Sequence, residues 1–139
     1  MAFVFQYTKD GTAPQTKYYK AAAVTITKGE LLYFSSGYVT NATFGDCDTN
    51  TVAGVAEETK VCSAGDLVPV QANRSAVYRV GTADTMAQDY VGYNCALASV
   101  TTITSNTNET DKDGVCHIEK HISTSEADVS INYYSPTEA

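Results

Sequence analysis

Short runs of apolar side chains alternate with polar positions along this chain, and glycine, asparagine, aspartate or serine interrupts the runs about every 8 to 12 residues. Residues 24–27 alternate apolar with polar side chains, as a half-buried strand does. Residues 75–80 also read as a strand, with Ala76, Tyr78 and Val80 on one face and Val77 and Arg79 on the other. The apolar run 30–34 is followed by Ser35-Ser36-Gly37 and a second short strand, which predicts a β-hairpin. The pattern therefore predicts an all-β fold.

The same order of strand motifs occurs twice, about 60 residues apart. Val39 corresponds to Val100, Gly54 to Gly114 and Asp66 to Asp128, at offsets of 61, 60 and 62 residues. A unit of four short strands is too small to bury its own apolar face, so two units are expected to stack. We predict a small β-barrel or sandwich built from two pseudo-repeated four-strand units, about residues 21–74 and 75–134, in a single β-domain of residues 21–139.

Residues 1–20 lie outside this repeat and form an N-terminal arm, in which a turn-rich linker joins an apolar start to Tyr18-Tyr19. Such an arm either completes a sheet of its own chain or adds a strand to a neighbour, and both alternatives remain open.

Three local features carry further expectations. Pro69 lacks an amide donor, so its strand is expected at a sheet edge or beside a bulge. Residues 82–88 are the one segment expected to form a helical turn. The polar run 105–114 is expected to be an exposed loop.

Length and charge limit the classes of function. A chain of 139 residues buries roughly 70% of its unfolded surface without needing a metal or a disulfide. The net charge is -7 and the 9 basic residues are scattered, which argues against nucleic acid and anionic membranes as partners. Apolar runs are shorter than the roughly 18 residues of a membrane span. The chain start does not have the pattern of a signal peptide, so synthesis in the cytoplasm is expected.

The four cysteines, Cys47, Cys62, Cys95 and Cys116, include no closely spaced pair, so reduced thiols are expected rather than a zinc or redox motif. If a disulfide forms, Cys47 and Cys62 are the first pair to test, because they bracket one predicted strand.

Cys116, His117 and His121 lie within six residues of each other. In a regular strand His117 and His121 share one face and Cys116 takes the other, so the three side chains are not expected to bind one metal.

Asp111-Lys112-Asp113-Gly114 is similar to a calcium loop, but Lys120 occupies the position of the bidentate glutamate, so a plain turn is expected. No glycine-rich phosphate loop and no nucleophile with a neighbouring base is evident. We therefore expect no enzyme activity, no cofactor and no metal.

The first unit carries the motifs of a known family. They are residues 24–33, Gly37-Tyr38-Val39-Thr40-Asn41-Ala42-Thr43, Gly54-Val55-Ala56, and Gly65-Asp66 before an apolar strand. In this succession, followed by a looser second copy, the chain resembles the small capsid decoration (cement) proteins of tailed bacteriophages over about residues 20–134. The N-terminal arm is not part of that pattern, and Ser125-Glu126-Ala127-Asp128 replaces the glycine before the final strand.

The resemblance implies a small β-barrel on the outside of an icosahedral head, made in the host cytoplasm, that binds the major capsid protein and stabilises its lattice, commonly as a homo-oligomer with a trimer favoured. The alternative is a receptor- or glycan-binding head appendage. An enzyme would need a pocket that joins His117 or His121 to a carboxylate. Tyrosine suits partly hydrated contacts, and the arm and tyrosine-rich ends are the expected capsid or subunit contacts: Phe3, Val4, Phe5, Tyr7, Tyr18, Tyr19, Tyr133 and Tyr134.

Overall fold

The structure is a computed structural model that describes residues 2–41, 51–104 and 114–133. Its elements are β1 (Val4–Thr8), β2 (Thr16–Lys20), β3 (Thr25–Ile26), β4 (Leu31–Ser35), β5 (Tyr38–Thr40), β6 (Thr51–Ala56), β7 (Lys60–Val61), β8 (Leu67–Gln71), β9 (Ala76–Thr82), η1 (Gln88–Tyr90), β10 (Asn94–Cys95), β11 (Leu97–Ser99), β12 (Thr102–Ile103), β13 (Cys116–Ser123) and β14 (Glu126–Ile131). The prediction of an all-β fold is confirmed.

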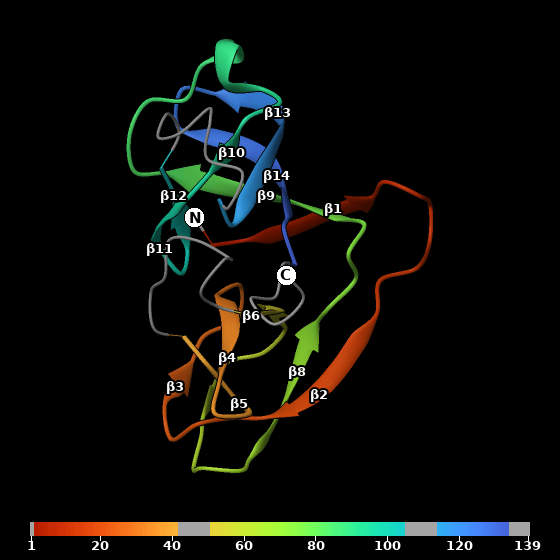
Figure 1. Cartoon of the computed structure of the whole chain (residues 1–139), viewed down its shortest axis with the longest axis vertical. Coiled ribbons are helices and arrows are strands. Elements are labelled where there is room, and N and C mark those ends of the chain that lie inside the picture. Colours follow the sequence, from red (N-terminus) through yellow and green to blue (C-terminus); the bar gives the residue numbers. More distant parts are fainter. Residues whose placement is uncertain (1, 42–50, 105–113, 134–139) are drawn as a thin grey trace.

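The strands form two lobes, one above the other in Figure 1. The upper lobe is a sheet in the order β10-β13-β14-β9-β12-β11, with β1 also paired to β9. The lower lobe is the sheet β2-β8-β6-β4-β5 with the small sheet β3-β7. Each lobe has a buried apolar cluster, and the upper cluster also includes Leu31, Val52 and Val55 from lower-lobe strands. The apolar core therefore continues across the junction between the lobes.

The two lobes repeat one strand order. In the lower lobe β2, β8, β6 and β4 are successive antiparallel neighbours, and in the upper lobe β9, β14, β13 and β10 follow the same order. Each lobe also contains a parallel pairing, between Ala21 and Val39 in the lower lobe and between Gly81 and Thr102 in the upper lobe. The strand β2, which lies in the arm, thus has the place in the lower lobe that β9 has in the upper.

The N-terminal arm pairs with its own chain in both lobes. β1 runs antiparallel to β9, and β2 runs antiparallel to β8. In Figure 1 the chain passes from β1 in the upper lobe down to β2 in the lower. Of the two alternatives for the arm, completion of its own sheets is the one observed.

The predicted hairpin is confirmed as β4 and β5. Ser36 and Gly37 connect them with φ values of 52° and 86°, the left-handed pair that a type I′ turn requires. This turn matches the twist of the flanking strands.

A bulge in β6 brings two strands unusually close. The register between β4 and β6 shifts at Leu32 and Tyr33, opposite Gly54, whose φ is 142°. A Cβ atom at Gly54 would lie 2.1 Å from the backbone oxygen of Gln71 on β8. Only glycine fits this close approach.

Two local expectations were wrong. β8 is not an edge strand, because it lies between β2 and β6, and neither of its two pairings contains a register shift, so Pro69 is not beside a bulge in them either. Pro69 is tolerated there because β6 pairs with β8 only at residues 70 and 71. Beyond this pairing, the Pro69 carbonyl accepts a hydrogen bond from the Glu57 amide. The helical turn is η1 at residues 88–90 rather than in 82–88. Residues 105–113 of the expected loop lie outside the described residues.

Candidate functional site

The predicted contact residues of β1 are divided between the two faces of the upper sheet. Val4 and Tyr7 are each 47% exposed and lie opposite Arg79 and Val77 in the ladder, so they share the outer face. Phe5 lies opposite Tyr78, is 36% exposed, and meets the Tyr78 ring edge-on. We call Val4 and Tyr7 the β1 patch.

Phe3 does not belong to any exposed surface. It is buried in the upper cluster, its amide donates to the Gly29 carbonyl, and its ring meets Tyr78 edge-on. Phe3 is therefore a core residue, and its backbone hydrogen bond joins the start of β1 to the turn before β4.

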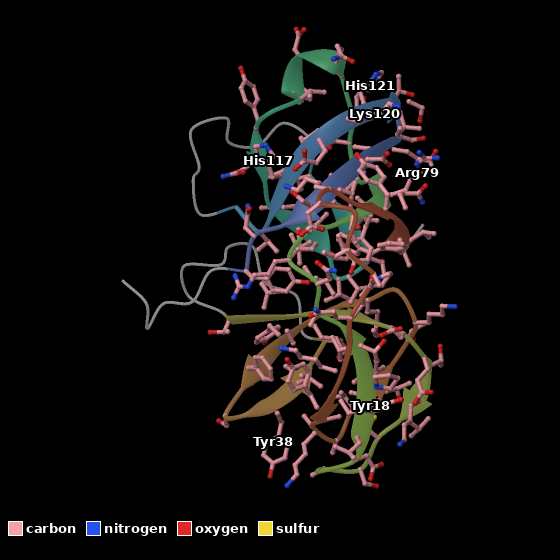
Figure 2. The ribbon with its side chains drawn as sticks, turned by 90° about the vertical axis from the view of Figure 1, so that its right-hand side faces the viewer. Tyr18, Tyr38, Arg79, His117, Lys120 and His121 are labelled. Carbon is pink, nitrogen blue, oxygen red and sulfur yellow. The ribbon has the colours of Figure 1, made fainter. Side chains whose placement is uncertain are left out.

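The tyrosine pair of β2 points to opposite faces. Tyr19 packs on the lower cluster, with its ring centroid 4.9 Å from that of Phe34. Tyr18 is 65% exposed, lies opposite Pro69, and shares that face with Leu67. We call Tyr18, Leu67 and Pro69 the β2 patch; Figure 2 places Tyr18 on the lower lobe.

Tyr133 is held against the upper cluster by Arg74. The guanidinium carbon lies 5.3 Å from the ring centroid, and Nη1 donates to the Tyr133 carbonyl at 3.0 Å. Burial raises the pKa of the Tyr133 hydroxyl, which contacts no hydrogen-bond partner within the described residues. Tyr134 lies outside those residues. The eight predicted residues therefore do not gather into one site.

A cleft of about 460 Å³ lies where the two lobes meet. Its lining residues are Ala2, Phe3, Val4, Phe5, Lys28, Gly29, Val55, Ala56, Glu57, Gln71 and Tyr78. Gln71 is 7% exposed and its Oε1 accepts the Tyr78 hydroxyl, whose pKa burial raises. Glu57 accepts a hydrogen bond from the Thr16 hydroxyl at 2.6 Å. An aromatic ring, Phe5, thus shares the cleft with a carboxylate and a lysine.

Sequence reasoning missed this cleft. Its walls come from β1, β6, β8 and β9 and from the turn at Lys28 and Gly29, which are far apart along the chain. No local motif marks a site that exists only once the two lobes are stacked.

The outer face of the upper sheet carries a charged network. Arg79 Nε lies 2.9 Å from Asp128 Oδ1, and the Asp128 side chain is only 3% exposed. Glu119 accepts hydrogen bonds from Ser130 at 2.6 Å and from Lys9 at 3.2 Å. Burial alone would raise the pKa of Glu119, but these hydrogen bonds and the Lys9 charge outweigh it and lower the pKa. The network ties the arm to β13 and β14.

The expectation that His117 and His121 share a face was wrong. His117 lies opposite Ser130 and His121 opposite Ala127, which point to opposite faces of β14. The reason is a register shift in β13 between Ile118 and Lys120, which inverts the alternation. His117 Nδ1 lies 2.7 Å from Asn94 Oδ1, and Figure 2 shows the two rings apart on the upper lobe. In residues 2–41, 51–104 and 114–133, no three His, Cys, Asp or Glu side chains are grouped to hold a metal.

The described cysteines are all buried. Cys62 lies in the lower cluster, whereas Cys95 and Cys116 lie in the upper one. Cys47 lies outside the described residues, so the structure does not test Cys47 with Cys62 as the first pair to examine for a disulfide.

No family model matches the chain, and no curated protein matches it. Among solved structures it is similar to the "N base" of the head fiber protein gp8.5 of bacteriophage phi29, with a TM-score of 0.53 and 15% identity, over 87% of this chain and 98% of that one. At this identity the likeness shows a shared fold. Within the described ranges, no helix is long and apolar enough to cross a membrane.

Proposed function

We propose that this chain is a structural protein of a bacteriophage head, which binds the outer surface of the icosahedral capsid and stabilises the lattice of the major capsid protein. The observation that carries the proposal is the shared fold with a piece of a phage head fiber, which extends over 87% of this chain. The sequence motifs separately resemble capsid decoration proteins. The shared fold and the sequence resemblance thus both support a protein of the phage head.

The surface supports a role in binding a lattice. The net charge of -7 keeps the free protein soluble. Tyr18 is the most exposed tyrosine of the described residues, and Leu67, 54% exposed, lies on the same face. An amphipathic ring beside aliphatic side chains suits a partly hydrated protein contact. We assign the capsid contact to the β2 patch.

The β1 patch is the counterpart on the other lobe. β1 pairs with β9 along one edge, and Val4 and Tyr7 are both exposed on its outer face. We assign this patch to contacts between copies of the chain, with a trimer favoured. Many weak identical contacts would then stabilise the lattice by mass action.

The second candidate is a head appendage that binds a receptor or a glycan. It is favoured by the likeness to a phage head fiber protein and by the cleft, whose lining includes Phe5 and Glu57. An aromatic ring and a carboxylate within one cleft suit a sugar, which presents an apolar face and hydroxyl groups.

The test is to add the purified chain to phage heads that lack it and to measure co-sedimentation and the temperature at which the heads release DNA. We expect saturable binding and a higher release temperature. Tyr18→Ala should weaken binding about 10-fold or more, as loss of a central aromatic contact does. Tyr93→Ala is the matched control, because Tyr93 is 37% exposed on the upper lobe, and it should bind within about twofold of wild type.

Two results would contradict the proposal. Failure of the wild-type chain to sediment with heads would remove the capsid role altogether. Binding of a few copies without any change in release temperature would favour the appendage.

A further inference from the structure

Two cysteines face each other across a pair of strands. Cys95 in β10 is the direct partner of Cys116 in β13. Directly opposed residues of an antiparallel pair point to the same face. Both side chains indeed lie in the upper apolar cluster, at 1% and 0% exposure.

The ladder sets the separation of the two residues. The Ile118 amide donates to the Tyr93 carbonyl at 2.9 Å, and this bond flanks Asn94 and His117, which are therefore a non-hydrogen-bonded pair. Cys95 and Cys116 are the next pair along both strands and therefore form a hydrogen-bonded pair. The Cα atoms of such a pair are about 5.5 Å apart, within the range of about 4.4 to 6.8 Å found for disulfides. Its Cβ atoms lie at the wide end of about 4.5 to 5.5 Å, so β10 must move toward β13 by about 1 Å for the bond to form.

Cys62 is not an alternative partner in the folded chain. It belongs to the lower cluster, which consists of residues from the lower lobe. Neither Cys95 nor Cys116 can reach it while the two lobes stay folded.

We infer that Cys95 and Cys116 are a disulfide-forming pair, which a small-molecule disulfide oxidises in the folded protein. The thiolate of one cysteine attacks the reagent and releases one small thiol. The second thiolate then attacks the mixed disulfide and releases the other. One disulfide bond breaks and one forms, and two protons leave the protein thiols, so no further oxidant is needed.

The position of β10 provides access to the buried thiols. β10 is two residues long, ends its sheet, and pairs with β13. Short edge strands open locally at little cost, so the reagent can enter without global unfolding. The bond would fix β10 to β13 and close the segment 95–116. A closed loop of this length raises Tm by about 10 °C.

The experiment is peptide mapping of the full chain. The reduced protein is incubated with oxidised glutathione under native conditions, remaining thiols are alkylated, and the chain is digested with trypsin without reduction. Cleavage after Arg79, Lys112 and Lys120 separates Cys95 from Cys116 into two peptides, 80–112 and 113–120. We expect these peptides to be joined and two hydrogens lighter than their sum, and the oxidised protein to melt about 10 °C higher than the reduced one.

The variants separate this pair from other cysteine chemistry. Cys62→Ser should keep the link and the rise in Tm, whereas Cys95→Ser should lose both. A sample oxidised in denaturant should give mixed pairings, which shows that the native fold selects this one. Alkylation of both Cys95 and Cys116 after native oxidation would overturn the inference, as would a native link from either of them to a different cysteine. The result does not depend on the proposed function.

Discussion

Replacement of Gly54 by alanine should be among the most destabilising single changes in this chain. The new Cβ would lie 2.1 Å from the Gln71 carbonyl oxygen and 2.9 Å from a methyl carbon of Val70. The first contact is with backbone, so no side-chain rotation relieves it. The φ of 142° at Gly54 is also unfavourable for any residue with a side chain.

The magnitude follows from three contributions. The backbone conformation costs about 1–2 kcal/mol for alanine. Separation of β6 from β8 weakens the two pairs that join them, Val55 with Gln71 and Ala56 with Val70, at about 1 kcal/mol for each hydrogen bond. The displaced side chains add about 1–3 kcal/mol. Together these give about 5 kcal/mol, a large part of the roughly 5–15 kcal/mol that stabilises a domain.

The assay is urea unfolding followed by tyrosine fluorescence and far-UV circular dichroism, since the chain has no tryptophan. Gly37→Ala is the matched control, because Gly37 also has a positive φ, 86°, but nothing lies within 4 Å of its added Cβ. It should cost about 1 kcal/mol. If the two variants unfold at the same urea concentration, the close approach of β6 to β8 does not exist and the account of the lower lobe is wrong.

Further predictions concern polar groups in and around the upper lobe. Tyr78→Phe should lower the free energy of unfolding, measured in urea, by about 1–3 kcal/mol, because it leaves the buried Gln71 Oε1 without its donor. Tyr133→Phe removes a hydroxyl that has no hydrogen-bond partner among the described residues, so it should leave the free energy of unfolding unchanged or raise it. A larger loss for Tyr133→Phe than for Tyr78→Phe would contradict this assignment. Ser130→Ala should cost about 1–2 kcal/mol at pH 7, where its hydroxyl donates to ionised Glu119. Burial raises the pKa of Glu119, but its hydrogen bonds and the Lys9 charge outweigh burial and lower the pKa from 4.5 in the folded protein. The stabilisation that Glu119 gives is therefore present above pH 4.5 and is lost as the pH falls through the folded pKa. The difference between wild type and Ser130→Ala should therefore shrink as the pH is lowered progressively below 4.5, and a pH-independent difference would refute it.

Features that depend on neighbouring residues could be predicted from the sequence. The β4–β5 hairpin follows from an apolar run and the turn residues Ser36 and Gly37. The alternation of Ala76, Tyr78 and Val80 correctly identifies the inward face of β9. The motifs spaced about 60 residues apart predict a repeat, and the two lobes do share one strand order, although β2 of the arm takes part in it.

Features that depend on distant strands could not be predicted. The register shift in β13, which separates the faces of His117 and His121, is set by its pairing with β14 and leaves no signature in composition. Pro69 occupies a strand between two neighbours because β6 ends beside it. The cleft forms only where the two lobes meet. Tyr18 is exposed and Tyr19 is packed only because the two neighbouring residues lie on opposite faces of β2.

We propose that this chain covers the outside of a phage head. The most direct test of this proposal is quantitative mass spectrometry of purified particles of the proposed source phage, with copies of this chain counted per copy of the major capsid protein. We predict a ratio near one, or a fixed simple fraction of one, as a protein bound across the lattice requires. Absence from the particle, or only a handful of copies, would contradict the claim.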